Sequence, residues 1–197
     1  MVTRKRLRWT AILCCHAIAN LAAYRAGWSG KKLRREEDFW RRVNSNFMDI
    51  AVLEWCKLFA DRRGFHCYTN VLTDPKGFET DLFAHLGVTT GDFDAYCAGI
   101  RTYRDKFVAH LDDSQAKYPQ LDIAIESTKF LFRYLRTQED PDNYLEGLPR
   151  NLVSAYRLAL NDAKASYLEK KPPNLSVKRD RPTAGFTGCR PAPYLQR

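Results

Sequence analysis

Apolar residues recur every three to four positions along several long segments of this 197-residue chain. Near the N-terminus the repeat is formed by Leu7, Ala11, Cys14, Ile18 and Leu21, which is the spacing of one face of an α-helix. Glycine and proline, which interrupt helices, number only 10 and 9. The pattern therefore predicts an all-α fold in which long helices pack as a single-domain bundle.

Start and stop signals divide the chain into its expected helices. Gly27 and Gly87 are typical of the residue that follows a helix, and Asp74-Pro75 is typical of an N-cap followed by the first helical residue. Residues 66–72 are a weak candidate for a strand. The expected helices cover residues 3–26, 36–61, 75–86, 92–111, 123–136 and 151–170.

The composition changes at Pro172. Five of the nine prolines lie between residues 172 and 193, and apolar periodicity is lost there. Such a segment cannot bury enough apolar surface to fold by itself. We therefore expect a helical domain over residues 1–171 and an extended, basic, proline-rich tail over residues 172–197.

Charge is distributed unevenly along the chain, whose net charge is +9. Residues 1–42 contain 11 Lys/Arg and 3 Asp/Glu, and residues 171–197 contain 6 and 1. The middle, residues 43–170, contains 15 and 19. Basic ends around a mildly acidic middle indicate a polyanionic partner or an anionic surface. The alternative is that the excess charge only keeps the protein in solution.

Cysteine usage and hydropathy indicate a reducing compartment, and we expect a cytoplasmic protein without a membrane span. The apolar run Trp9–Ala23 follows four basic residues and imitates a secretory signal, but His16 and Asn20 interrupt it. No other stretch approaches the ~20 apolar residues that a span requires. No Cys-x-x-Cys pair occurs among the cysteines, which are Cys14, Cys15, Cys56, Cys67, Cys97 and Cys189.

The expected helix over residues 92–111 combines an arginine with a histidine. Arg104 falls in the middle of its apolar face, where a guanidinium is costly unless it is paired or faces a polar cleft. The alternative is that the stem packs and the head reaches solvent. His110 lies about 120° around the helix from Arg104, beside Tyr103 and Lys106. By itself it would be an ordinary surface histidine.

Arg104-Asp105-x4-His110 resembles the motif of the HEPN superfamily. That motif is Arg-x4–6-His near the end of a long helix, with a polar residue directly after the arginine. Here five residues intervene, and Asp105 fills the polar position. The segments 103–112 and 53–59 are similar to the abortive-infection branch of the superfamily. The resemblance covers the expected helical domain and excludes the tail.

The resemblance implies a homodimeric endoribonuclease that needs neither metal nor cofactor, with the two motifs facing each other across the dimer cleft. It implies a toxin or abortive-infection effector, with RNA as substrate and an antitoxin protein as a further partner. Histidine can move a proton near neutral pH, and arginine can hold phosphate oxygens with two parallel hydrogen bonds. One alternative is a non-catalytic HEPN domain that binds a nucleotide or a protein partner. Another is a basic scaffold or nucleic-acid-binding protein without chemistry.

Several residues are candidates for supporting roles. Glu54 lies on the same side of its expected helix as Ala51 and Leu58, so opposite charges on two apolar stripes predict a Glu54–Arg104 pair that aims the guanidinium. The alternative is that Glu54 lies at the edge, near solvent. His16, His66 and His85 lack metal-ligand spacing, so no metal site is predicted. Weak candidates for RNA binding, which equally fit a solvated face, are Lys106, Arg101, Arg41 and Arg42.

Overall fold

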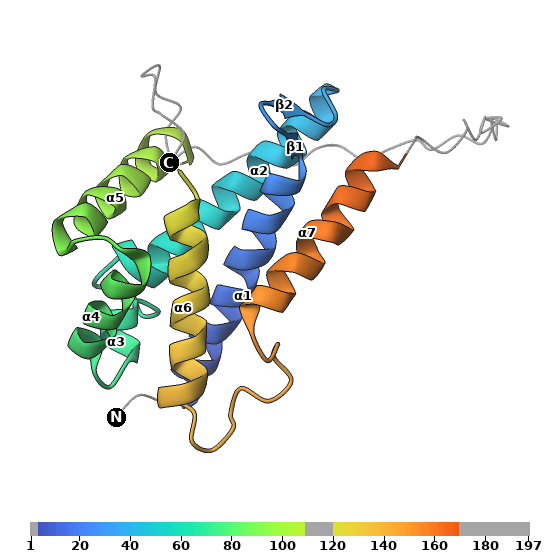
Figure 1. Cartoon of the computed structure of the whole chain (residues 1–197). Helices are drawn as coiled ribbons and strands as arrows, with labels where there is room; N and C mark the ends of the chain where they lie inside the picture. The colour runs from blue at the N-terminus through green and yellow to red at the C-terminus, as the bar shows by residue number, and fades with distance from the viewer. Residues whose placement is uncertain (1–3, 109–119, 170–197) are drawn as a thin grey trace, which may run out of the picture.

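The structure is a computed structural model, and it describes residues 4–108 and 120–169. The expected all-α fold is confirmed: helices form nearly all of the regular structure in these ranges, beside one two-stranded hairpin (Figure 1). None of the described helices is long and apolar enough to cross a membrane. The expected tail, residues 172–197, lies outside the described residues.

The helices follow the expected order with small shifts at their ends, and the labels η1 and η2 denote π-helical segments. In chain order the elements are α1 (Arg4–Ala26), β1 (Trp28–Ser29), β2 (Lys32–Leu33), α2 (Asp38–Trp55), η1 (Cys56–Ala60), α3 (Tyr68–Val71), α4 (Pro75–Leu86), α5 (Thr90–Tyr103), η2 (Arg104–Val108), α6 (Asp122–Gln138) and α7 (Leu152–Leu168).

Capping residues mark the beginnings and ends of the helices at the expected places. The Asp74 carboxylate accepts a hydrogen bond from the backbone N–H of Gly77 at 2.9 Å, so it caps α4. Gly87 ends the same helix with φ at 65°, a conformation that glycine adopts without strain. Thr89 and Asp92 form a reciprocal capping box at the start of α5.

α1 is the central helix of the bundle. It packs against α2, α6 and α7 (Figure 1), and the predicted stripe from Leu7 to Leu21 is buried in this contact. α1 and α7 run in one direction, while α2 and α6 run in the other. α1 therefore packs antiparallel to α2 and α6 and parallel to α7, and buries its apolar stripe among all three.

A second part of the core joins α2, α5 and α6 through aromatic side chains. The rings of Trp55 and Phe59 stack at 5.1 Å, and Phe93 of α5 lies edge-on to Phe59 at 6.0 Å. The indole N–H of Trp55 donates to the hydroxyl of Ser127 on α6 at 3.0 Å, so its polar atom is satisfied inside the core. These contacts hold the end of α2 firmly against α5.

One expectation about local structure is wrong. The weak strand candidate at residues 66–72 contains the short helix α3, because its buried residues follow helical spacing rather than alternation; they are Cys67, Tyr68, Val71 and Leu72. Between the first two helices, where the sequence predicts no regular structure, the chain forms the hairpin of β1 and β2, in which Gly30 takes a positive φ of 59°.

Candidate functional site

Arg104 opens η2 and is held by two carboxylates. Its Nη1 donates to Oδ1 of Asp61 at 2.6 Å, and its Nε donates to Oδ1 of Asp105 at 2.8 Å. The side chain is 21% exposed, so the expectation that a guanidinium on this face needs a partner is confirmed. The hydrogen bond to Asp105, followed by that to Asp61, raises the pKa of Arg104 above its ordinary value against the effect of burial. Arg104 therefore stays cationic.

The π-helical end of the second helix brings Asp61 to Arg104. The backbone N–H of Asp61 donates to the carbonyl of Cys56, five residues earlier, at 2.8 Å. α5 packs directly against this wide turn, and η2 begins where α5 ends. Short π-helical segments occur frequently at functional sites. Arg104 is the first residue of η2, and Asp61 is the residue directly after η1, so the ion pair joins the start of one such segment to the end of the other.

Arg104 lies in an open hollow of about 460 Å3, which we call the arginine hollow. Four arginines and two aspartates line it, so its net charge is positive. Arg62 pairs with Asp94 at 2.8 Å at the surface. Such a concentration of guanidiniums is suited to the phosphate oxygens of a polyanion. The lining residues are Ala60, Asp61, Arg62, Arg63, Gly64, Arg101, Arg104 and Asp105.

The loop on one side of the arginine hollow is fixed to α1. The Asn70 amide donates to the carbonyls of Arg62 and Gly64 at 2.8 and 3.0 Å. Arg6 of α1 donates in turn to the Asn70 carbonyl at 2.9 Å. The arginines of the loop are therefore held on a braced backbone, which reduces the entropy lost when they bind a ligand.

The same loop leads into a second hollow that carries exposed aromatic rings. Phe65 directly follows Gly64 in the chain, and its side chain is 64% exposed; Trp9 is 53% exposed. The Arg6 guanidinium lies 3.7 Å from the centre of the Phe65 ring. We call this surface the aromatic patch; it is lined by Lys5, Arg6, Trp9, Phe65 and His66.

The prediction that Glu54 pairs with Arg104 is wrong. Glu54 Oε2 accepts a hydrogen bond from the Asn20 amide at 3.1 Å, and its Oε1 lies 3.7 Å from His16 Nδ1. Arg104 instead reaches Asp61, which lies two helical turns further along the chain. Burial raises the pKa of Glu54, and the hydrogen bond from Asn20 opposes this shift. Glu54 therefore joins α2 to α1 and has no contact with Arg104.

Tyr103 also has a different place from the one expected. The sequence places it beside His110 as a supporting residue of the site, and the structure buries it in the core. Its hydroxyl donates to Oδ1 of Asp49 at 3.0 Å, and this bond ties α5 to α2. The reason is spacing, because Tyr103 continues the buried series of Cys97 and Ile100 at three-residue intervals.

The four weak RNA-binding candidates do not gather at one place. Arg101 lines the arginine hollow, and Lys106 is exposed on η2. Arg41 and Arg42 lie near the start of α2, and Arg42 is about 20 Å along the helix axis from Cys56. The sequence does not mark Asp61 or the arginines that follow it as site residues, because they lie at and just beyond the end of the expected helix over residues 36–61.

His110, the predicted catalytic histidine, lies outside the described residues, two positions after the end of η2. The thiols near the arginine hollow are poor nucleophiles, because burial raises the pKa of Cys56 and of Cys97 to about 12. Within residues 4–108 and 120–169, no group of three or more His, Cys, Asp or Glu side chains is arranged to hold a metal ion.

Comparison with known proteins gave no match: no family model, no curated protein and no solved structure matches this chain. The geometry of the arginine hollow is therefore the basis for any functional assignment beyond the motif itself.

Proposed function

We propose that this protein is a HEPN-type endoribonuclease that cuts single-stranded RNA at the arginine hollow. The observation that carries the proposal is the position of Arg104, the arginine of the motif, on the wall of a hollow with three further arginines. A chain of phosphates matches this arrangement in charge and in hydrogen-bonding geometry.

In the proposed reaction the 2′-OH of the RNA attacks the adjacent phosphorus. The bond from phosphorus to the 5′-oxygen breaks, leaving a 2′,3′-cyclic phosphate and a 5′-OH end. His110 accepts the proton of the 2′-OH or returns one to the leaving oxygen, because imidazole titrates near neutral pH. Arg104 stabilises the charge that builds on the phosphate oxygens. Neither step requires a metal ion.

The aromatic patch supports a single-stranded substrate. Trp9 and Phe65 expose their rings beside Lys5 and Arg6, and Phe65 is joined to the arginine hollow through Gly64. Unpaired bases stack on exposed aromatic side chains while neighbouring cations bind the backbone. A strand with its phosphate at Arg104 would therefore meet Phe65 on the same loop and Trp9 on the adjoining α1.

The motif's resemblance further supports a homodimer that acts in the cytoplasm as a toxin or abortive-infection effector, with an antitoxin protein as partner. The second candidate is a non-catalytic HEPN domain that binds a nucleotide or a protein. One observation favours this second candidate: the carboxylates of Asp61 and Asp105 already form ion pairs with the Arg104 guanidinium. Phosphate must displace at least one of them before Arg104 can act.

Incubation of purified full-length protein with labelled strands in EDTA separates these candidates. We expect cutting of single-stranded RNA to products that end in a 2′,3′-cyclic phosphate, and no cutting of DNA of the same sequence. Binding of RNA or nucleotide without cutting would favour the non-catalytic domain. Cutting only after magnesium is restored would assign the protein to another class of nuclease.

A further inference from the structure

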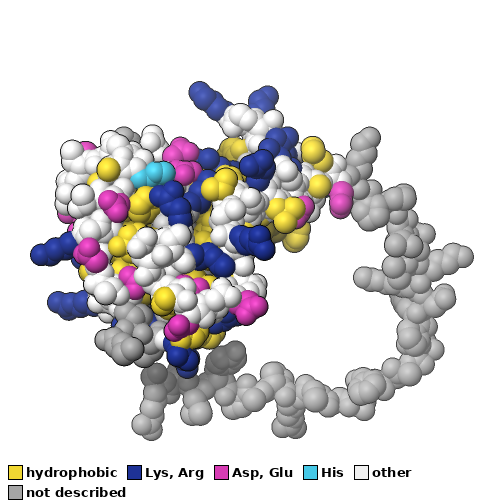
Figure 2. Space-filling model, turned by 60° about the horizontal axis from the view of Figure 1, so that its bottom comes forward, with side chains coloured by type: hydrophobic (Ala, Val, Ile, Leu, Met, Phe, Trp, Pro, Cys, Tyr) yellow, Lys and Arg dark blue, Asp and Glu magenta, His cyan; other side chains and the backbone are white. Residues whose placement is uncertain are grey.

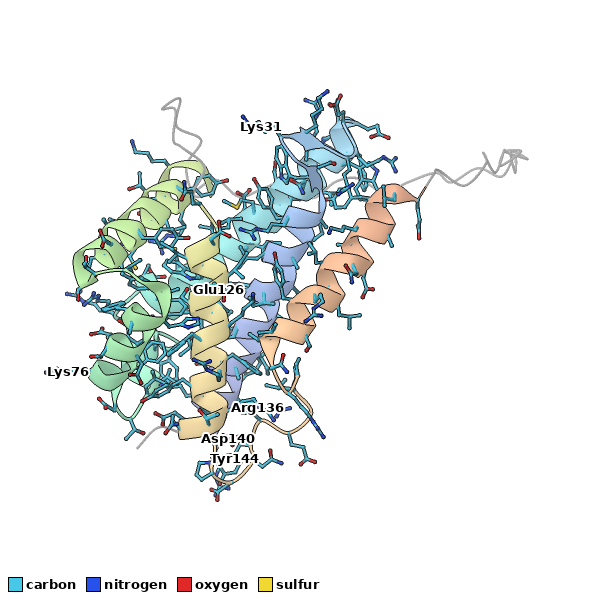
Figure 3. All side chains as sticks on the ribbon, in the orientation of Figure 1. Lys31, Lys76, Glu126, Arg136, Asp140 and Tyr144 are labelled. Atoms are coloured by element: carbon cyan, nitrogen blue, oxygen red, sulfur yellow. The ribbon has the colours of Figure 1, made fainter. Side chains whose placement is uncertain are left out.

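A separate cavity of about 170 Å3 lies where α6 meets the start of α7. Glu126 and Arg136, labelled in Figure 3, lie near the two ends of the stretch of α6 that lines it. Phe130 and Phe132 of α6 and Leu152 of α7 provide an apolar floor, and all three are buried. The cavity thus differs from the arginine hollow in its size and in its lining.

Cations surround this apolar floor. Lys129, Arg133, Arg136 and Arg150 line the cavity, and Glu126 is the acid among its lining residues. Figure 2, which turns the lower end of the molecule toward the viewer, shows Lys and Arg side chains around hydrophobic surface on this face.

Two of the guanidiniums are oriented by contacts with the floor and the backbone. Arg133 lies 4.6 Å from the centre of the Phe130 ring, and Arg136 lies 5.9 Å from that of Phe132. Nη1 of Arg136 also donates to the carbonyls of Leu145 and Pro149, at 3.1 and 3.3 Å. Their positive charge is therefore held beside the apolar floor.

The first turn of α7 adds to the positive potential. Asn151 caps the helix by accepting from the N–H of Ser154 at 2.8 Å. Leu152 and Val153, which both line the cavity, occupy the first two helical positions, whose N–H groups lack partners within the helix. A helix start of this kind favours an anion.

We propose that this cavity binds a small organic phosphate, a phosphomonoester attached to a ring-sized apolar body. A cavity of roughly 150 Å3 holds one benzene ring, so the apolar part fits inside the cavity against its apolar floor. The phosphate then meets the guanidiniums of Arg133 and Arg150, which are suited to a dianion. This site is independent of the proposed RNA cleavage, because it uses none of the residues of the arginine hollow.

Calorimetric titration of the full-length protein with phenyl phosphate tests the proposal. Inorganic phosphate and phenol serve as separate probes of the anionic part and the apolar part of the ligand. We expect phenyl phosphate to bind at least 10-fold more tightly than either probe and to raise the melting temperature. The Arg133→Gln and Val153→Trp variants, both at exposed positions, should weaken binding at least 10-fold. Arg157→Gln, an exposed change on α7 that lies outside the cavity, should bind like wild type.

Equal affinity for phenyl phosphate and inorganic phosphate would overturn the proposal, because the apolar floor would then contribute nothing. Unchanged binding in folded Arg133→Gln and Val153→Trp proteins would also overturn it. Loss of binding in Arg104→Lys, with Arg133→Gln unaffected, would assign the ligand to the arginine hollow instead. RNA cutting is measured separately, so failure of either proposal leaves the other intact.

Discussion

The arginine hollow and the α6–α7 cavity both concentrate cations, but they differ in what accompanies the charge. The arginine hollow is wide, and aspartates already pair with Arg104. The α6–α7 cavity is smaller, and its cations surround buried phenylalanine rings. An open polar surface is suited to a polymer that brings many phosphates, whereas an apolar floor selects a small ligand with a body to bury. Positive charge alone therefore does not define a ligand.

The largest contrast between the two regions should come from conservative arginine substitutions. Arg104→Lys keeps the charge but loses the planar fork, so we expect RNA cleavage to fall by about 100-fold or more. Arg133→Lys, in the α6–α7 cavity, should leave cleavage within about twofold. Cleavage rates under single-turnover conditions measure both. Equal losses in the two variants would remove the distinction between the regions.

The aromatic patch should govern RNA affinity rather than stability. Trp9→Ala and Phe65→Ala each remove one stacking surface, which is typically worth about 1–3 kcal/mol per base. We therefore expect weaker binding of single-stranded RNA, measured by fluorescence anisotropy, with little change in melting temperature. Leu158→Ala, at an equally exposed apolar position on α7, is the matched control. Wild-type affinity in both aromatic variants would exclude the patch from the RNA site.

Within the arginine hollow, the half-buried ion pair should matter more for stability than the exposed one. Asp61→Asn weakens the charge-assisted bond to Arg104, and we expect a loss of about 1 kcal/mol in the free energy of unfolding. Asp94→Asn breaks the Arg62 pair, whose partners are 62% and 53% exposed, and should cost less than about 0.5 kcal/mol. Urea titrations compare the two. A reversed order would contradict the pairing of Arg104 with Asp61.

The smallest effect concerns Glu54. Because its pKa is raised in the folded state, the folded protein holds this proton more tightly, and stability falls as pH rises past the ordinary pKa of glutamate. Glu54→Gln cannot ionise, so it avoids this loss of stability, and its amide oxygen still accepts a hydrogen bond from the Asn20 amide. We therefore expect a slightly higher melting temperature than wild type at neutral pH and no increase at acidic pH. RNA cleavage should not change. A strong loss of cleavage in this variant would show that Glu54 belongs to the RNA-cleavage site after all.

The sequence predicted the helices well because caps and apolar spacing are local properties. The Asp74 cap, the Gly87 stop and the stripe of α1 need no knowledge of neighbouring helices. The partner of Arg104 was not predictable in this way. Glu54 and Asp61 are seven residues apart and share one side of an ideal helix, so only the packing of α5 against η1 selects Asp61.

The α6–α7 cavity was missed for a related reason. Its lining comes from α4, α6 and the start of α7, and His85, Arg133 and Arg150 are far apart in the chain. No local pattern marks these residues, because each one is an ordinary exposed cation or histidine on its own helix or loop. A site assembled from three elements becomes visible only when the fold is known.

Cleavage of a labelled single-stranded RNA by His110→Ala, measured beside wild type in EDTA, tests the central claim most directly. His110 is expected at the polar edge of its helix, so the variant should fold and melt like wild type. We predict that cleavage falls by about 100-fold or more, the contribution typical of a general acid or base. A folded His110→Ala protein that cuts RNA at the wild-type rate would contradict the assignment of the motif as a ribonuclease site.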